Sequence, residues 1–462
     1  MRRINYLFGF IGFVFCLYSI SKNSFSQEWK TYNTDNSNLP FYLVPSIACD
    51  SSGVVWVGTG DVRGNGGGLA KLCDDNWTIY TIENSDLPKN SIWELLPDNE
   101  NGIWVGTAGG LSGSGEGLAH FDGENWTVFN TSNSDLPGNS ISALKFDSLM
   151  NLWVGTSEGL AMFDGVNWAV YTSENSDLPM DNVSSIAFDT NDNLWVSLYG
   201  GGLASYDGVT WTVIKSDNSG LPTNNVTSIA FDSQNRLWIG TAVYHSGPFG
   251  KGLCMFDGEN WETWDKDNSE LPHNDVFTVV VDRSDNVWLG CGDHVPVSDG
   301  GLVKFDGTNW EVFTPDNSGI PFHFPYTVAI DKFGNKWVGS VNHDEQGGLA
   351  VFNEETIVLE CTLTAIEENT LTEHTGNTYL KQNFPNPVKN MTHFKYNLNR
   401  SGKVHLGIYD ISGKLVDEIV SEHQIPGHYR INWNRNDLPD GVCFYKLTID
   451  KRPETRKMIL IY

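Results

Sequence analysis

Two short clusters that combine histidine with carboxylates are the side chains best suited to chemistry in this chain. They are Asp293-His294 and His343-Asp344-Glu345. Imidazole nitrogens and carboxylate oxygens can ligate a divalent metal, or they can act together as an acid and a base. Because the two clusters lie in different segments of the chain, either chemistry requires elements that bring those segments together.

A second group of residues suits ligand binding rather than bond making. Exposed aromatic rings with a few polar groups are typical of sites for carbohydrate or peptide. Together with the two clusters, the candidate ligand contacts are Arg63, Trp93, Tyr244, His245, Phe249, Phe277, Asp293, His294, His323, Tyr326, His343, Asp344 and Glu345. We assign none of them a catalytic role, because the sequence has no serine elbow, phosphate loop or HExxH motif. We expect no cofactor, with a divalent metal as the alternative.

An internal repeat over residues 28–353 supplies the elements that position these side chains. A W-[VIL]-[GS] element occurs seven times, and so does an N-S-x-[LI]-P element. Each unit carries four strand signals, as at 228–231, 237–240, 253–256 and 260–264. Repeated units of four short strands predict an all-β fold, a seven-bladed β-propeller over residues 27–355.

The register of the repeat predicts how the ring closes. A lone strand signal over residues 28–32 precedes the first unit, and the seventh unit ends after its third strand. We therefore expect the N-terminal strand to complete blade seven, which covers an otherwise exposed sheet edge. Residues 356–359 are the alternative occupant of that edge.

Two differences among the repeats locate a candidate cleft. The loop between the second and third strands is short in blades three and four, and long in blades five, six, seven, one and two. At the start of the first strand, blades three to five carry small hydroxyl residues, whereas blades two, six and seven carry Trp93, Phe277 and Tyr326. His273 and His323 lie in the preceding crossovers. These features predict a ligand cleft at the channel mouth, skewed towards blades five to two.

Two other abundant features of the repeat have structural interpretations. Most of the 17 tryptophans occupy the second or fourth strand of a unit, where large rings fill the space between blades. An aspartate follows the first strand of every unit, as at Asp232, and its carboxylate can cap turn amides. We interpret these aspartates as turn residues rather than as a ring of calcium ligands.

The N-terminus has the pattern of a secretory signal peptide over residues 1–26. Arg2 and Arg3 precede an apolar run, and Ser24 and Ser26 are suitably small residues before the cut. The run is shorter than the ~20 residues of a membrane span, which makes an anchor the weaker alternative. No other stretch approaches that length, so we expect no span in the mature chain.

Cysteines and charge restrict the classes of function. The cysteines are sparse and form no CxxC motif, and we interpret Cys49 and Cys73 as buried hydrophobic residues rather than as a bridge. The chain of 462 residues has 57 acidic and 29 basic side chains, a net charge of -28 that argues against a nucleic-acid partner. Residues 356–377 are rich in Glu and Thr and are interpreted as a linker, whereas residues 378–462 are net basic.

The repeat LWVGT...GLA.FDG.NW...NS.LP.N resembles the two-component regulator propeller repeat. That family supplies periplasmic sensor domains of hybrid histidine kinases, often in polysaccharide-using Bacteroidota. The resemblance covers most of residues 28–353 and implies a propeller, but it supplies no catalytic motif. The family's sensors also carry a second propeller, a membrane span and a kinase. None of these is recognised here, so a signalling role is not carried over.

Residues 378–462 resemble the type A C-terminal sorting domain of type IX secretion. The resemblance rests on LKQNFPNP at 380–387, on GKVHLGIYD at 402–410 followed by GKLV at 413–416, on LPDGV at 438–442 and on TRKMIL at 455–460. The alternating strand pattern alone indicates a small Ig-like β-sandwich. The resemblance implies engagement with the type IX secretion machinery and export through the periplasm to the cell surface or the medium.

These observations favour a secreted or surface-attached propeller that acts as a ligand-binding or interaction module. Glycan is the first candidate ligand, and a surface protein is the other candidate partner. A metal-dependent lyase or hydrolase on the same face, with a His/acidic site like that of a streptogramin lyase, is the alternative from a different class. The third hypothesis is that the chain is a structural or adhesive surface protein.

Overall fold

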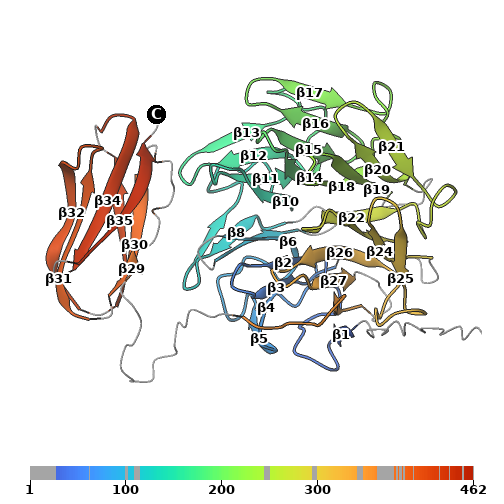
Figure 1. The fold of residues 1–462 in the computed structure, drawn as a ribbon, viewed down its shortest axis with the longest axis horizontal. Helices are drawn as coiled ribbons and strands as arrows, with labels where there is room; N and C mark the ends of the chain where they lie inside the picture. The colour runs from blue at the N-terminus through green and yellow to red at the C-terminus, as the bar shows by residue number, and fades with distance from the viewer. Residues whose placement is uncertain are drawn as a thin grey trace, which may run out of the picture.

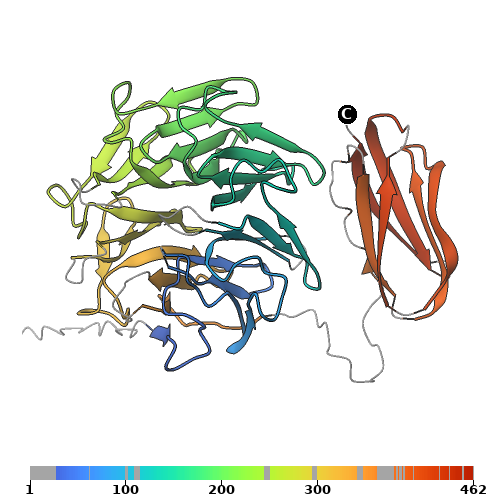
Figure 2. The same cartoon turned by 180° about the vertical axis from the view of Figure 1, so that it is seen from behind.

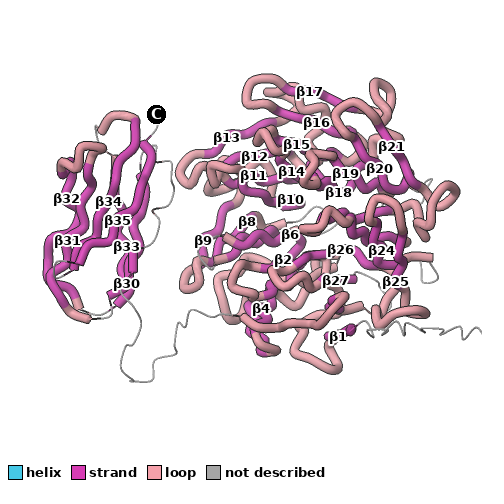
Figure 3. Tube along the Cα trace, viewed as in Figure 1, coloured by secondary structure: helices cyan, strands magenta, loops and turns pink. Residues whose placement is uncertain are grey.

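The computed structural model describes residues 28–460 apart from residues 62, 99–101, 109–114, 244–249, 294–298, 341–346, 362–378, 381–382, 384–387, 389–390, 399, 426, 436–437 and 450–451. The predicted signal peptide lies outside the described residues. All regular structure in the described part is strand (Figure 3). Within it, no helix has the length and apolar character needed to cross a membrane.

Seven four-stranded antiparallel sheets form the blades of the propeller (Figure 1). Each blade runs from an inner strand at the central channel to an outer strand at the rim. Blade one consists of β2 (Ser46–Cys49), β3 (Val55–Gly58), β4 (Leu69–Cys73) and β5 (Asn76–Tyr80). Blade two consists of β6 (Ile92–Pro97), β7 (Ile103–Thr107), β8 (Leu118–Phe121) and β9 (Trp126–Phe129). Blade three consists of β10 (Ile141–Phe146), β11 (Leu152–Thr156), β12 (Gly159–Phe163) and β13 (Trp168–Tyr171).

The remaining blades repeat this arrangement, which is seen from behind in Figure 2. Blade four consists of β14 (Val183–Phe188), β15 (Leu194–Leu198), β16 (Gly202–Tyr206) and β17 (Trp211–Ile214). Blade five consists of β18 (Val226–Phe231), β19 (Leu237–Thr241), β20 (Gly252–Phe256) and β21 (Trp261–Trp264). Blade six consists of β22 (Val276–Val281), β23 (Val287–Cys291), β24 (Gly301–Phe305) and β25 (Trp310–Phe313).

Blade seven is built from both ends of the propeller. Its sheet order is β1 (Glu28–Tyr32), β28 (Leu349–Asn353), β27 (Lys336–Ser340) and β26 (Pro325–Ile330). Trp29 pairs with Phe352 in the register, and their rings stack at 4.7 Å. The predicted closure by the N-terminal strand is confirmed, and residues 356–359 do not occupy that edge.

The tryptophans and turn aspartates have the structural roles expected of them. Trp238 is 2% exposed and stacks on Trp264 of the outer strand at 5.6 Å. The Asp232 carboxylate accepts the Gln234 and Arg236 amides at 2.9 Å and the Trp238 indole N–H at 2.9 Å. The same carboxylate therefore holds both the turn and the orientation of the buried ring.

The chain stays on the ring beyond its last strand, which corrects the expected start of the linker. Residues 354–361, here called the strap, run from blade seven to blade one. The Asn335 side-chain amide donates to the Val358 carbonyl at 2.6 Å, and Ile357 and Leu359 pack on the apolar cluster between these blades. Periodicity could not reveal this segment, because a single extended pass over a surface has no repeat.

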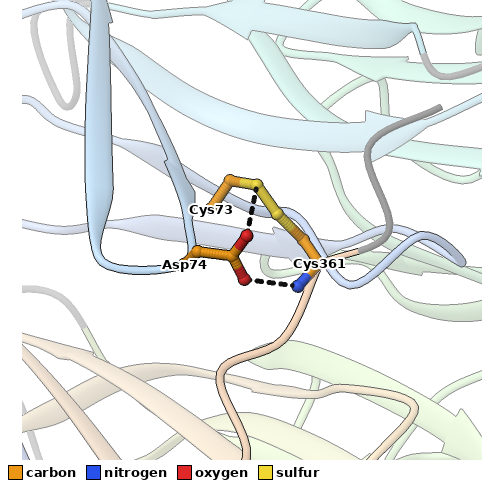
Figure 4. Close-up of side chains that lie close together, drawn as sticks. All are labelled: Cys73, Asp74 and Cys361. Carbon is orange, nitrogen blue, oxygen red and sulfur yellow. Dashed lines mark hydrogen bonds between the residues drawn. A yellow bond between two sulfur atoms is a disulfide. The ribbon is translucent and has the colours of Figure 1, made fainter. Parts of the chain in front are cut away.

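A disulfide ends the strap and corrects the interpretation of Cys73. Cys73, the last residue of β4, is bonded to Cys361, with 5.5 Å between the Cα atoms (Figure 4). The Asp74 carboxylate accepts the Cys361 amide at 2.9 Å beside the bridge. Cys49 is a free, half-buried thiol. The pairing was missed because the partners are separated by 288 residues.

The C-terminal domain is a separate β-sandwich. One sheet has the order β29 (Tyr379–Leu380), β30 (Met391–Leu398) and β33 (Gly427–Asn434). The other has the order β32 (Leu415–Gln424), β31 (Gly402–Tyr409), β34 (Gly441–Ile449) and β35 (Arg452–Leu460). Strand β34 alternates buried and half-buried residues, as expected where one face of a sheet packs on a core. Side chains of both sheets form that core, among them Phe394 and Tyr445.

Candidate functional site

A β-bulge in the inner strand of six blades directs one side chain towards the channel mouth. In blade three, for example, the pairing of β10 with β11 skips Ser142 between Ile141 and Ala143. Bulges re-aim a side chain because the extra residue has no partner across the ladder. The residues at this position, with Pro45 before β2 in blade one, are Pro45, Trp93, Ser142, Ser184, Thr227, Phe277 and Tyr326. All seven line a central channel of about 1090 Å³.

Aromatic rings occupy one arc of this mouth, across blades six, seven and two. Trp93 meets Tyr326 edge-on, with ring centroids 6.0 Å apart, and Phe277 lies 5.6 Å from Tyr326. Phe324, which precedes β26, completes the group at 5.0 Å from Phe277. Phe277 and Phe324 are buried, whereas Trp93 and Tyr326 remain half-buried. The predicted contact Phe277 therefore supports the arc, and Trp93 and Tyr326 present its accessible rings.

The opposite arc consists of hydroxyl groups that tie neighbouring blades together. Ser142 Oγ donates to the Val183 carbonyl at 2.5 Å, and Ser184 Oγ donates to the Val226 carbonyl at 2.8 Å. Thr227 Oγ1 repeats the bond to the next blade at 2.6 Å. These hydroxyls already use their protons within the ring, so the aromatic arc is the more accessible recognition surface.

The loops of blades one, three and five have the same anchor, although they differ in length. Thr59 donates a hydroxyl hydrogen bond of 2.8 Å to the Gly68 carbonyl just before β4, and Thr241 donates one of 2.8 Å to the Gly252 carbonyl at the start of β20. The short loop of blade three has the same bond from Thr156. Since the base is fixed, loop length can vary without disturbing the sheet below.

Only part of the predicted contact set lies on described loops. The blade-one loop is folded around Asp61, whose carboxylate accepts the amides of Arg63 and Asn65. Arg63 is exposed at this loop. The predicted contacts outside the described residues are Tyr244, His245, Phe249, His294, His343, Asp344 and Glu345.

A buried carboxylate that the sequence analysis missed holds the blade-five loop. Asp275 is 3% exposed and accepts the amides of Val243 and Gly250, at 2.9 and 2.6 Å, at the two ends of that loop. Burial raises the pKa of Asp275, and burial lowers the pKa of His273, whose Nδ1 accepts the Asp275 amide at 3.0 Å. The signal was an aspartate where four of the other crossovers have serine or asparagine. The half-buried Asp293 and His323 lie on neighbouring segments of this face.

Two charged side chains inside the channel were also missed. Glu94 follows Trp93 on β6, and Lys145 is on β10 of the next blade. Desolvation raises the pKa of Glu94 to about 8, against the opposing effects of Lys145 and the Leu144 amide. Desolvation also lowers the pKa of Lys145, although its side chain is open to the lumen. Both residues lie on strands that are otherwise mostly apolar, so the sequence pattern indicated core strands and no charged site.

Metal-binding capacity in the described part of the chain is limited to one group. Cys73, Asp74 and Cys361 place three donor atoms within 4.8 Å of one another. Their two sulfurs are joined in the disulfide, so neither is a thiolate ligand in this structure. The group is the end of the strap rather than a metal centre.

Comparison with known families agrees with this architecture. The two component regulator propeller model matches residues 38–61, 86–109 and 220–242, and the secretion system C-terminal sorting domain model matches residues 382–461. Three segments of the propeller thus match the regulator propeller repeat, and the C-terminal domain matches a secretion sorting domain. Because it carries a type IX sorting domain, this propeller protein is exported to the cell surface or secreted. No curated protein matches its sequence.

Solved structures show the same fold at low identity. The extracellular domain of a hybrid two component system from B. thetaiotaomicron is 18% identical, with a TM-score of 0.58 over 94% of this propeller protein and 57% of that chain. PorZ, a surface component of the type-IX secretion system of Porphyromonas gingivalis, is 16% identical, with a TM-score of 0.50 over 92% and 60%. Virginiamycin B lyase from Staphylococcus aureus is 11% identical, with a TM-score of 0.53 over 71% and 99%. The propeller protein thus spans less than two thirds of the first two chains.

Proposed function

We propose that this exported propeller is a ligand-binding module whose ligand, with a glycan as the first candidate, occupies the channel mouth. The observation that carries the proposal is the aromatic arc over a channel of about 1090 Å³. Trp93 and Tyr326 are half-buried rings, rigid and amphipathic, and such rings supply large contact area to sugar faces. The sequence predicts that the longer loops of blades five to two border the same cleft.

The arc is pre-organised for binding. The Trp93 indole N–H donates to Ser91 Oγ at 3.1 Å, which fixes the ring against rotation. Phe277 and Phe324 are buried beside Tyr326 and fix that ring in turn. A rigid surface loses little conformational entropy when a ligand binds, so more of the contact energy appears as affinity.

A glycan array probed with the full chain, with and without EDTA, tests this function. We expect binding to a defined set of glycans, without turnover and without dependence on metal, because the proposed contacts require no cofactor. Trp93→Ala and Tyr326→Ala should each weaken that binding at least tenfold. Tyr199→Ala changes an aromatic residue on the opposite arc of the same channel and should leave binding unchanged.

Three outcomes would count against the proposal. Binding that survives both arc substitutions would place the ligand elsewhere. Turnover that EDTA abolishes would favour the alternative of a metal-dependent lyase or hydrolase, with Asp293, His294 and His343 as the first residues to substitute. Binding to a surface protein but to no glycan would favour the adhesive role.

A further inference from the structure

Glu94 and Lys145 are the two charged side chains among the described residues that line the channel. The rest of the lining consists of hydroxyl, amide, aliphatic and aromatic side chains. A charge enclosed by protein is costly unless something compensates it. An acidic and a basic side chain on adjacent blades inside one cavity therefore require an explanation beyond the closure of the ring.

The alignment of the blades shows that neither charge is needed for blade packing. Glu94 pairs with Gly106, and the equivalent residues of the other blades are Ser46, Ala143, Ser185, Ser228, Thr278 and Thr327. Lys145 pairs with Trp153, and its equivalents are Ala48, Leu96, Ala187, Ala230, Val280 and Ala329.

A hydroxyl is sufficient for the structural task at the Glu94 position. Ser228 Oγ accepts the Val279 amide of the next blade at 3.0 Å, and Ser185 Oγ accepts the Ile229 amide at 3.3 Å. The Leu144 amide bonds to the Glu94 carboxyl in the same way. A carboxylate has about four acceptor positions, so most of this group's capacity is not used by that amide.

The two charges interact through space without a hydrogen bond to each other. Lys145 acts on Glu94 only as a neighbouring charge, and the Lys145 side chain is exposed to the lumen. The residue of β10 that is equivalent to Glu94 is Ala143. Lys145 lies two residues beyond Ala143, which is an offset of about 6.6 Å along the strand. An α-amino acid held by two charge-assisted bonds of about 2.8 Å spans a distance on the order of 8 Å, and an extended dipeptide spans roughly 3.5 Å more.

We propose that Glu94 and Lys145 form a binding site inside the channel for a small α-amino acid zwitterion, as the free amino acid or a dipeptide. The ligand's ammonium group bonds to Glu94, and its carboxylate bonds to Lys145. Because Trp93 directly precedes Glu94 on β6, an apolar or aromatic side chain of the ligand reaches the rings of the mouth. The two ionic contacts lie below the proposed glycan surface and do not depend on it, whereas the ligand's side chain shares the rings of that surface.

Proton release on binding follows from the surroundings of Glu94. The strands packed against β6 are β2, β3, β7 and β10, and among their side chains only Lys145 is charged and only Cys49 carries a thiol. With its pKa raised to about 8, Glu94 is mostly protonated at pH 7. An arriving ammonium group stabilises the carboxylate, so the complex forms with the release of up to one proton.

Isothermal titration calorimetry of the full chain at pH 7, in two buffers of different ionisation enthalpy, tests the site. The zwitterionic probes are L-phenylalanine and L-alanyl-L-phenylalanine. N-acetyl-L-phenylalanine lacks the positive charge, and L-phenylalaninamide lacks the negative charge. We expect the wild type to bind one or both zwitterions and each blocked analogue at least tenfold more weakly. The comparison of the two zwitterions identifies the source of the ligand.

Variants assign each end of the ligand to one residue. Glu94→Gln should bind the zwitterion about tenfold or more weakly, abolish proton release and no longer discriminate against the acetylated analogue. Lys145→Met should lose discrimination against the amide instead. Glu262→Gln on the outer strand β21 and Lys215→Met, directly after the outer strand β17, are the matched controls and should bind as the wild type does.

Two results overturn the proposal: wild-type protein that binds neither zwitterion, or folded Glu94→Gln and Lys145→Met variants that bind them as the wild type does. Circular dichroism and thermal unfolding establish that the variants are folded. The glycan array is unaffected by either result, so failure here is distinguishable from failure of the proposed function.

Discussion

Removing the Cys73–Cys361 bridge should destabilise the propeller substantially, although every blade keeps its own hydrogen bonds. We consider the double substitution Cys73→Ser/Cys361→Ser, which leaves no unpaired thiol at the site. The bridge closes a loop of 288 residues. For a loop of that length, the chain-entropy model gives about 5 to 6 kcal/mol, and native bridges commonly contribute about 2 to 5 kcal/mol.

The bridge also holds the strap in place. Without it, the Asn335–Val358 and Asp74–Cys361 hydrogen bonds and the packing of Ile357 and Leu359 must retain the segment alone. We therefore expect a loss of about 4 kcal/mol in the free energy of unfolding. With an unfolding entropy of about 2.1 cal/mol/K per residue over roughly 330 residues, this lowers Tm by about 6 °C.

Thermal and urea unfolding of the full chain, each with and without dithiothreitol, measures this effect. The reductant should lower the stability of the wild type to that of the double variant and leave the variant unchanged. Cys49→Ser removes a free thiol of the same blade and serves as the control, since it should keep the response to reductant. Wild-type and double-variant unfolding curves that coincide in oxidising buffer would refute the reasoning.

Three further predictions concern other parts of the ring. The folded pKa of Glu94, about 8, lies above its ordinary value of 4.5, so Glu94 stabilises the fold below about pH 4.5 relative to higher pH, and that contribution is lost as the pH rises to 8. In urea titrations, Glu94→Gln should therefore be more stable than the wild type at pH 8.5, by on the order of 3 kcal/mol, and of similar stability at pH 4.5. A stability difference that does not change with pH would contradict this. Asp232→Ala should lower the free energy of unfolding in urea by about 2–3 kcal/mol, because it leaves the buried Trp238 N–H without its acceptor. The control Asp257→Ala, at an exposed hairpin, should lower it by less than about 1 kcal/mol. Equal losses of stability would count against the role assigned to Asp232. Trp29→Ala should lower the free energy of unfolding by about 3 kcal/mol and make blade seven susceptible to limited proteolysis, because the Trp29 ring stacks on Phe352 in the closing strand pair. A proteolysis pattern like that of the wild type would contradict this prediction.

The ring could be predicted from the sequence because its determinants repeat. Trp238, Asp232 and their equivalents recur in each unit, so seven weak strand signals reinforce one another into one architecture. The closure by residues 28–32 followed from the same register. The strap and the Cys73–Cys361 bridge occur once, and a contact between single residues far apart in the chain leaves no period in the sequence.

The sequence predicted the residues of the candidate site that differ in size from their equivalents in other blades. It did not predict the residues that differ from their equivalents in charge. Trp93, Phe277 and Tyr326 are conspicuous because their equivalents are small, and the structure places all three at the channel mouth. Burial was not evident, since only the packed ring shows that Phe277 is enclosed while Trp93 remains accessible. The sequence did not distinguish Glu94, Lys145 and Asp275 from the many other charged residues. The role of each depends on the cavity or loop that its side chain contacts, which only the folded structure shows.

The pairing of β1 with β28 has a consequence for the order in which the propeller folds. Glu28 is opposite Asn353 in that register, whereas the hairpins within the other blades join residues close together in the chain. Local hairpins form quickly, but a contact between chain segments this far apart carries a large entropy of loop closure. Blade seven is therefore the last to be completed, after the remaining blades have brought the two ends together. Until then the nascent ring is an open arc with an unpaired β28 edge, the species most exposed to aggregation and to proteases during export.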